Sequence, residues 1–285
     1  MAALLARQGN SVVVLAREST NRAIAAQGLR VESARFGDFQ VDVRSAVRLE
    51  DEVDACLITV KSTQLKEALE RVPPGAVAQS LMVPFLNGID HVDVIRDAFP
   101  GSATAAATIR IEAARAAPGL ILQTSPFATV ELAAEPSTRD DVQALADQLS
   151  GAGLDVRVRD DETAMLWDKL VFLAPLALLT THERANVGEI RTRCRTEALA
   201  VISEVAAVAQ AEGAAVDPGA VTRLLDSVPA TMESSMQRDQ ASGLPLELDA
   251  IGGAVVRRAA KLGVAVPVTA RLVEELGQRG SGSVR

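Results

Sequence analysis

Short apolar runs separated by polar segments fill the first half of the chain. Residues 12–15 form a continuous run rich in β-branched side chains, and residues 56–60 form a second run of the same kind. Runs of this length and composition are typical of buried strands in a parallel sheet. Between them, residues 29–31 and 39–43 flank a Gly37-Asp38 turn signal, which predicts a β-hairpin.

Helical segments alternate with these strands. The polar and apolar positions predict helices over residues 64–72, 88–99 and 140–149, and further strands over residues 81–86 and 154–158. Residues 103–132 predict antiparallel strands interrupted by turns. The alternation is typical of an α/β fold, so we expect residues 1–159 to form a Rossmann-like, doubly wound sheet.

The pattern changes after about residue 160. Helical spacing dominates from there on, in five segments: residues 164–181, 195–212, 218–227, 246–261 and 269–278. Asp217-Pro218 is a typical helix start, because proline suits the first helical position. We therefore expect a second, all-α domain over residues 160–285.

The beginning of the chain is unusual for a dinucleotide-binding domain. Residues 2–8 resemble the last turns of a helix, Gly9 its C-terminal cap, and residues 12–15 the strand that follows. In such domains a first strand and a Gly-x-Gly-x-x-Gly turn precede this helix. The chain contains no such motif, and Gly252-Gly253 lies within a predicted helix. We therefore expect that the first strand and the Gly-rich loop are missing from a truncated N-terminus, either because the reading frame starts further upstream or because this is a decayed paralogue.

That absence has a physical consequence. The first strand of a doubly wound sheet lies in its middle, so the strands at residues 12–15 and 56–60 would lack their shared neighbour. Each buried backbone group left unpaired costs roughly 1–3 kcal/mol.

Composition excludes several classes of protein. The net charge of −8 argues against a nucleic-acid-binding surface, and the absence of tyrosine argues against a base-stacking platform. The two cysteines and two histidines lack paired ligand spacing, so we expect no metal site, and Cys56 is interpreted as a small core residue. Apolar runs such as residues 171–179 fall short of the roughly 20 residues of a membrane span. The opening residues do not form a secretory signal, so we expect a cytoplasmic protein.

Polar residues follow three of the predicted strands. Arg17 comes after residues 12–15, where dinucleotide folds recognise the ribose and an arginine accommodates the 2′-phosphate of NADP; the alternative is a solvated surface arginine. Lys61 ends the strand at 56–60, and Asn87-Gly88 follows the strand at 81–86. Ligands bind outside such strand ends, although an Asn-Gly pair is also an ordinary turn.

Two charged residues stand out in the helical half. Lys169 precedes a long apolar run, so it is either a surface residue with a partly covered stem or a cation held where the two predicted domains meet. A lysine held in such a place is suited to proton transfer. Glu247 precedes another apolar stretch and is a candidate partner for that cation, with a surface position as the alternative.

Several segments resemble one enzyme family. They occur in the family's order and comprise Leu57-Ile-Thr-Val-Lys-Ser-Thr63, Phe85-Leu-Asn-Gly-Ile-Asp90, Leu166-Trp-Asp-Lys-Leu170, Ser234-Ser-Met236 with Asp239 and Glu247, and residues 256–267. Each match is weak alone, but the ordered set resembles the ketopantoate reductase (2-dehydropantoate 2-reductase) family over nearly the whole chain.

The resemblance implies an activity and residue roles. It implies NADPH-dependent reduction of a 2-oxoacid to the 2-hydroxy acid, as in pantothenate biosynthesis. Lys169 would be the general acid, and Glu247 would help to set the protonation and position of the catalytic groups. Asn87 would bridge cofactor and substrate, Ser235 would hold the substrate carboxylate, and Lys61 would contact both ligands. Together with Arg17, Lys61 and Asn87 would bind NADP, and the helical domain would carry a homodimer surface.

One departure affects the substrate. The family presents asparagines four and eight residues after the catalytic lysine, where this chain has Leu173 and Ala177. An apolar wall cannot hydrogen-bond the hydroxyl of ketopantoate, so we expect a more apolar 2-oxoacid. Two alternatives remain: a non-catalytic truncated paralogue that retains only a helical interaction domain, and a 3-hydroxyacid dehydrogenase, which the segment from Ser234 to Glu247 disfavours.

Overall fold

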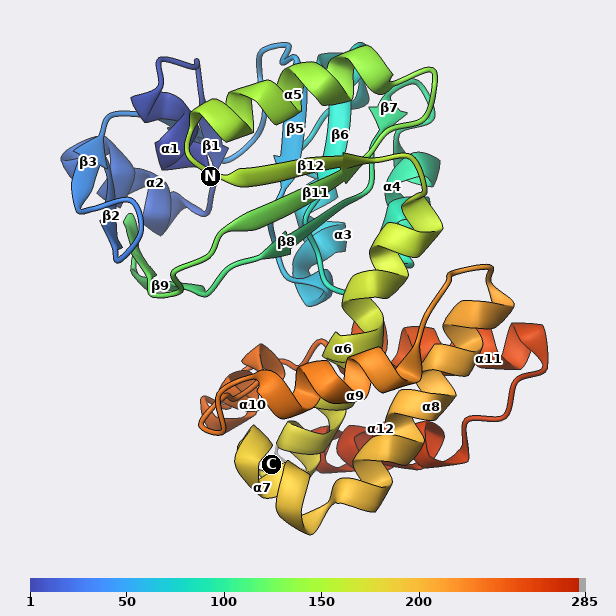
Figure 1. Ribbon diagram of the computed structural model, residues 1–285. Coiled ribbons are helices and arrows are strands. Elements are labelled where there is room, and N and C mark those ends of the chain that lie inside the picture. Colours follow the sequence, from blue (N-terminus) through green and yellow to red (C-terminus); the bar gives the residue numbers. More distant parts are fainter. Residues whose placement is uncertain (282–285) are drawn as a thin grey trace. The chain divides into compact units, whose positions relative to one another are not determined.

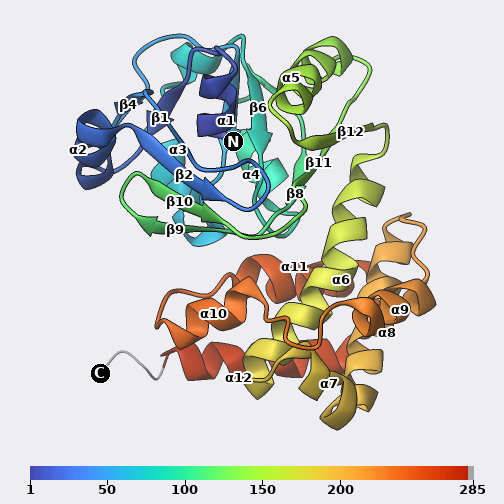
Figure 2. The same cartoon turned by 60° about the vertical axis from the view of Figure 1, so that its left-hand side comes forward.

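The computed structural model describes residues 1–281 of the chain. The chain divides into two compact units (Figures 1 and 2). The first unit contains Met1–Val60, Gln64–Phe85 and Val92–Asp161. The second contains everything from Glu162 onward together with two short loops of the first half, Lys61–Thr63 and Leu86–His91.

The first unit alternates strands and helices, as an α/β fold does. Its helices are α1 (Ala2–Arg7), α2 (Glu18–Gln27), α3 (Leu65–Leu69), α4 (His91–Ala98) and α5 (Arg139–Gly151), with a short 3₁₀ turn at Pro74–Val77. Another 3₁₀ turn, Ser62–Gln64, begins in a loop of the second unit and leads into α3. Its strands are β1 (Val13–Leu15), β2 (Leu29–Ser33), β3 (Phe39–Val41), β4 (Arg44–Ala46), β5 (Ala55–Ile58), β6 (Leu81–Pro84), β7 (Ala103–Thr104), β8 (Ala107–Arg110), β9 (Ala113–Ala117), β10 (Leu120–Gln123), β11 (Thr129–Ala133) and β12 (Asp155–Arg159). The fold class predicted from the sequence is confirmed.

The strands form four small hydrogen-bonded sheets. Their orders are β1-β4, β3-β2-β10-β9, β12-β11-β8 and β5-β6-β7. The predicted hairpin is present as the antiparallel pair β2 and β3. Strands β5 and β6 pair in parallel, as the continuous apolar runs predicted. Strand β7 also pairs in parallel with β6, which corrects the expectation that residues 103–132 form antiparallel strands throughout.

No described strand is hydrogen-bonded to both β1 and β5. Strand β1 pairs only with β4, and β5 pairs only with β6. All of β1 and most of β5 are half-buried, whereas β6, which has a neighbour on each side, is fully buried. The lack of a shared neighbour is the arrangement expected from the sequence.

A single apolar cluster holds much of the first unit together. It joins Leu4 of α1, Val83 of β6, Leu132 of β11 and Leu149 of α5, all of which are buried. Figure 1 shows α5 lying along β12 and β11. Burial of leucine and valine side chains of this kind contributes about 1.5–3 kcal/mol each before the conformational entropy cost is counted.

The second unit consists of helices grouped around α6 (Glu162–Glu183). The others are α7 (Val187–Arg193), α8 (Arg195–Ala211), α9 (Pro218–Ser227), α10 (Ser235–Ala241), a π-helical turn η3 (Asp249–Gly253), α11 (Ala254–Leu262) and α12 (Pro267–Ser281). Helix α6 contacts α7, α8, α9, α10 and α12 (Figure 2). It is the one helix of residues 1–281 whose length and composition alone would suit a membrane span. Two-thirds of its apolar window (67%) is buried inside the protein, as in a core helix.

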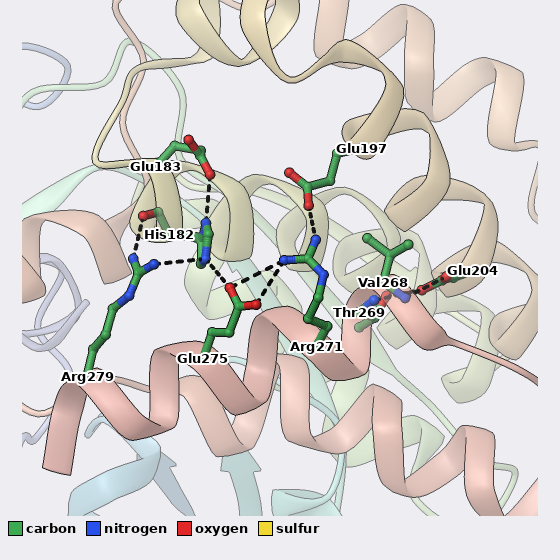
Figure 3. A network of polar contacts seen from close by, with 9 residues as sticks. All are labelled: His182, Glu183, Glu197, Glu204, Val268, Thr269, Arg271, Glu275 and Arg279. Carbon is green, nitrogen blue, oxygen red and sulfur yellow. Dashed lines mark hydrogen bonds and ion pairs between the residues drawn. The ribbon is translucent and has the colours of Figure 1, made fainter.

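Polar contacts fix α12 against α6 and α8 (Figure 3). The Glu204 carboxylate of α8 accepts hydrogen bonds from the backbone N–H groups of Val268 (3.0 Å) and Thr269 (2.8 Å), both in the first turn of α12. Near the other end of α12, the Glu275 carboxylate contacts Nε2 of His182 at 2.6 Å and also pairs with Arg271. These contacts give partners to two backbone N–H groups of the first turn of α12, which have no acceptor within the helix. They also pair the charge of Glu275.

Candidate active site

The loops that follow β5 and β6 begin at the same edge of the sheet. The strands are parallel and in register, with Ile58 opposite Pro84, so the chain leaves both at the same edge. Lys61 follows the end of β5 by three residues, and Asn87 follows the end of β6 by the same number. The loops that contain them both belong to the second unit.

Glu247 joins these two loops. Its Oε2 accepts a hydrogen bond from Nδ2 of Asn87 at 2.9 Å, and its Oε1 accepts one from the backbone N–H of Ser62 at 3.0 Å. Glu247 is only 6% exposed, and a buried carboxylate needs such donors to offset its desolvation. Because Nδ2 of Asn87 is bound to Glu247, its carbonyl Oδ1 is the group that Asn87 can best offer to a ligand.

The backbone of the Asn87 loop packs directly on the π-helical turn. Gly88 has φ = +88°, and a Cβ atom at this position would lie 2.1 Å from the carbonyl oxygen of Ala250. Only glycine satisfies both conditions. The Asn87-Gly88 pair is therefore more than a surface turn: Gly88 lets the loop approach η3, just after Glu247.

Lys61 is held by an acidic residue of α10. Its Nζ lies 2.5 Å from Oδ1 of Asp239, whose side chain is 12% exposed, while the Lys61 side chain is 40% exposed. The ion pair connects the loop after β5 to α10. Lys61, Asn87, Glu247 and Asp239 thus belong to one constellation.

Lys169 lies on α6 and is half-buried. Its charge acts on His91, the last residue of the Asn87 loop segment: burial, then the Lys169 charge, lower the pKa of His91 to about 4, and Asp90 only partly opposes them. His91 is 5% exposed, and neither ring nitrogen has a hydrogen-bond partner among residues 1–281. Its imidazole is therefore neutral at physiological pH. The charge of Lys169 therefore acts on the residue that ends the Asn87 loop.

Asp90 anchors the same loop to α11. Its Oδ2 accepts from Arg257 at 2.8 Å, and its Oδ1 accepts from Arg258 at 3.1 Å. Burial alone would raise the pKa of Asp90, but the hydrogen bonds from the two guanidinium groups outweigh that effect and lower the pKa. Asp90 consequently remains a carboxylate at neutral pH.

Two predicted site residues are not brought into these contacts. Ser235 is exposed at the start of α10, and its neighbour Ser234 is the buried N-cap, whose Oγ accepts from the backbone N–H of Gln237 at 3.0 Å. Arg17 lies in the first unit at the start of α2, where it is 61% exposed and 3.7 Å from Glu67. The position of Arg17, immediately after β1, is the one from which the 2′-phosphate role was predicted.

The sequence did not single out Asp239 of this constellation, nor the residues around it that lie on the Asn87 loop or contact Asp90. Asp90, Arg257 and Arg258 lie in segments that carried the family resemblance, but no local spacing marked them as partners of one another. His91 follows such a segment and has no sequence signal of its own. Asp239 could have been selected, because it lies on the sequence signature between Ser235 and Glu247. Cys56 has a pKa raised by burial to about 11, so it is protonated at neutral pH and unsuited to nucleophilic chemistry.

Comparison with known proteins identifies the family. Residues 1–134 match the family described as ketopantoate reductase PanE/ApbA, and residues 161–279 match the C-terminal part of the same family. A 2-dehydropantoate 2-reductase of Pyrobaculum aerophilum is 30% identical over 81% of this chain and 78% of its own length. An uncharacterized oxidoreductase of Bacillus subtilis, YkpB, is 29% identical over 93% of this chain and 89% of its own length.

A solved structure agrees with the sequence matches. The PanE/ApbA family ketopantoate reductase from Ralstonia eutropha superposes with a TM-score of 0.88 at 27% identity, covering 98% of this chain and 93% of that one. The resemblance noted from the ordered sequence segments is confirmed. The chain belongs to the ketopantoate reductase family of oxidoreductases.

Proposed function

We propose that this protein reduces a small 2-oxoacid to the 2-hydroxy acid with NADPH. The observation that supports this most directly is the joining of Asn87 and the loop of Lys61 through one buried carboxylate, Glu247, with the Lys169 charge acting on the same loop. A nearby positive group can protonate the ketone oxygen and stabilise the developing alkoxide, and the amide can orient the substrate.

The cofactor proposal rests on Arg17, Lys61 and Asn87. Arg17 would pair with the 2′-phosphate, which favours NADPH over NADH, and Lys61 and Asn87 would contact the cofactor near its reactive end. The unpartnered nitrogens of buried His91 mark a place where a polar ligand would be accommodated. A Gly-rich turn for the pyrophosphate is not found in residues 1–281. When bound, the nicotinamide supplies the hydride.

The protein's own groups account for the rest of the chemistry. Lys169 would donate a proton to the substrate oxygen as the carbonyl is reduced, and its charge would stabilise the developing alkoxide. Glu247 would keep the Asn87 amide and the loop of Lys61 in position. Ser235 would bind the substrate carboxylate from its exposed position on α10.

The residues of α6 that follow Lys169 favour an apolar substrate. Leu173, half-buried, and Ala177, 1% exposed, lie four and eight residues after Lys169, so they share its side of the helix. Neither can hydrogen-bond a substrate hydroxyl. We propose a 2-oxoacid with a branched apolar side chain in preference to ketopantoate.

We further propose that residues 1–159 bind NADP and that residues 160–285 provide substrate contacts and a homodimer surface. A cytoplasmic location, where NADPH and small oxoacids are available, is part of the same proposal.

The test combines binding with turnover. Titration with NADPH, followed by nicotinamide fluorescence, should give a saturable change. Absorbance of NADPH should then fall on addition of branched 2-oxoacids, faster than with NADH at equal concentration. Saturable binding without reduction of any 2-oxoacid would reject the proposed activity.

A non-catalytic role is the second candidate. The lack of pairing that links β1 to β5 favours it. In a nucleotide-binding sheet, the cofactor binds at the carboxyl ends of the middle strands, which therefore need to be continuous. The absence of any saturable response to NADPH would support this candidate and exclude the first.

A further inference from the structure

Arg258 connects the Asn87 loop to other helices of the second unit. Its Nε and Nη2 donate to Oδ1 of Asp90 at 3.2 and 3.1 Å, and its Nη1 donates to Oε1 of Glu212 at 2.9 Å. Glu212 is the C-cap residue of α8, and its Oε2 accepts from Nε1 of Trp167 at 2.9 Å. One guanidinium therefore spans a loop carboxylate and a carboxylate that is itself bound to α6.

The two ends of this chain of contacts lie next to the proposed chemistry. Asp90 follows Asn87 by three residues in the same loop. Trp167 precedes Lys169 by two residues on α6 and is only 1% exposed, so its indole is fixed in the core. The Arg258 side chain is 24% exposed and that of Glu212 is 14% exposed, so solvent screens these contacts less than surface pairs.

The neighbouring Arg257 provides an internal comparison. It pairs with Oδ2 of the same Asp90 at 2.8 Å, but its other ion pair is with Asp249, whose side chain is 87% exposed. The Arg257 side chain is itself 48% exposed. Arg257 thus holds the loop to the start of its own helical segment, whereas Arg258 holds it to α8 and, through Glu212, to α6.

We propose that Arg258 is a positioning residue for the reduction, fixing the Asn87 loop relative to the turn of α6 that carries Lys169. This proposal rests on the proposed function. A planar guanidinium with five N–H donors can bridge two carboxylates in fixed geometry, which the single ammonium of a lysine cannot do. Misplacing a catalytic group by about 1 Å can cost on the order of 100-fold in rate.

The test compares Arg258→Lys with Arg257→Lys in the full chain. Both variants keep the charge and remove one guanidinium from Asp90. For Arg258→Lys we expect kcat to fall on the order of 10- to 100-fold with KM for the 2-oxoacid changed about threefold or less. For Arg257→Lys we expect kcat to stay within about twofold of the parent. Equal kcat in the two variants, whether both normal or both reduced, would overturn the proposal.

A second measurement does not depend on activity. Hydrogen exchange of the amides in residues 86–91 should be about tenfold faster in Arg258→Lys and nearly unchanged in Arg257→Lys. If the parent reduces no 2-oxoacid, the proposed function fails, and the exchange result alone decides whether Arg258 fixes the loop. Unchanged exchange in Arg258→Lys would reject the positioning role. Should Arg258→Lys not fold, Glu212→Gln, which leaves the pair with Asp90 in place, is expected to show the same fall in kcat, and normal turnover there would also reject it.

Discussion

The buried carboxylate of Glu247 holds two loops of the chain together. Each of its oxygens accepts one hydrogen bond, from Ser62 and from Asn87, and these donors come from loops that follow different strands. A carboxylate without those donors would be costly at 6% exposure. The same contacts that stabilise Glu247 therefore place Lys61 and Asn87 near each other.

The residue most informative about the substrate is Leu173. In Leu173→Asn, an amide would replace an apolar group on the side of α6 that carries Lys169. We expect kcat/KM for ketopantoate to rise roughly 10-fold relative to 2-oxo-3,3-dimethylbutanoate, which differs by lacking the hydroxyl. Steady-state rates with the two substrates measure this ratio. An unchanged ratio would show that Leu173 does not contact the side chain of the substrate.

His91 predicts a specific pH dependence of stability. Its pKa is lowered, so the fold favours the neutral imidazole, and the unfolded chain takes up the proton first as the pH falls. The contribution is complete above the unfolded pKa of 6.5 and is lost as the pH falls toward about 4. This shift corresponds to roughly 3 kcal/mol in the free energy of unfolding.

Removing the titrating group isolates that contribution. Between pH 7.5 and pH 4.5, His91→Gln should lose roughly 2–3 kcal/mol less stability than the parent, because all other groups are shared. Urea unfolding at the two pH values supplies the comparison. Parallel losses in parent and variant would mean that folding does not lower the pKa of His91.

At the scale of elements, α12 depends on a cap provided by another helix. Glu204 of α8 accepts from two backbone N–H groups of the first turn of α12 and from Oγ1 of the fully buried Thr269 (Figure 3). Glu204→Ala leaves these donors unpaired and should lower stability by about 1–2 kcal/mol. We expect Tm to fall by a few degrees, whereas Glu274→Ala, on the exposed side of α12, should leave it nearly unchanged. Equal Tm values for both variants would contradict the capping role.

The number of neighbours that each strand of the first unit has leads to a second prediction. Strand β1 is paired on one side and half-buried, whereas β6 and β11 each lie between two neighbours and are mostly buried. Backbone amides in residues 13–15 should therefore exchange with solvent at least about 10-fold faster than those in residues 82–83 and 130–132. Exchange followed by mass spectrometry measures this difference. Comparable protection would show that something covers the free edge of β1.

Local patterns predicted most elements but not those that depend on partners. Buried strands, the β2–β3 hairpin and the long helices follow from periodicity and turn residues. Helix α7 was not predicted, although Asn186 and Glu189 form a capping box that marks its start. Helix α10 was also missed, because its few apolar positions give weak periodicity and Ser234, its N-cap, was treated only as part of the family signature. The strand β4 is only three residues long and is defined by its pairing with β1.

At the scale of the whole molecule, the sequence suggested site residues but not their partners. Lys61, Asn87 and Glu247 were selected from strand ends and family signatures, yet Ser62 and Glu247 lie 185 residues apart in the chain. Contacts over such separations are set by the fold, and no local spacing reports them. The pairing of Lys61 with Asp239 and the Arg258 network belong to this class.

The proposed activity depends above all on Lys169, which we propose protonates the 2-oxoacid as it is reduced. The most direct measurement is NADPH-dependent turnover of a branched 2-oxoacid by Lys169→Ala. The affinity for NADPH is measured on the same preparation. Lys261→Ala, on the exposed side of α11, is the control. We predict that kcat falls on the order of 100- to 10,000-fold in Lys169→Ala while the Kd for NADPH changes less than about threefold. Turnover equal to that of the parent and of Lys261→Ala would contradict the claim.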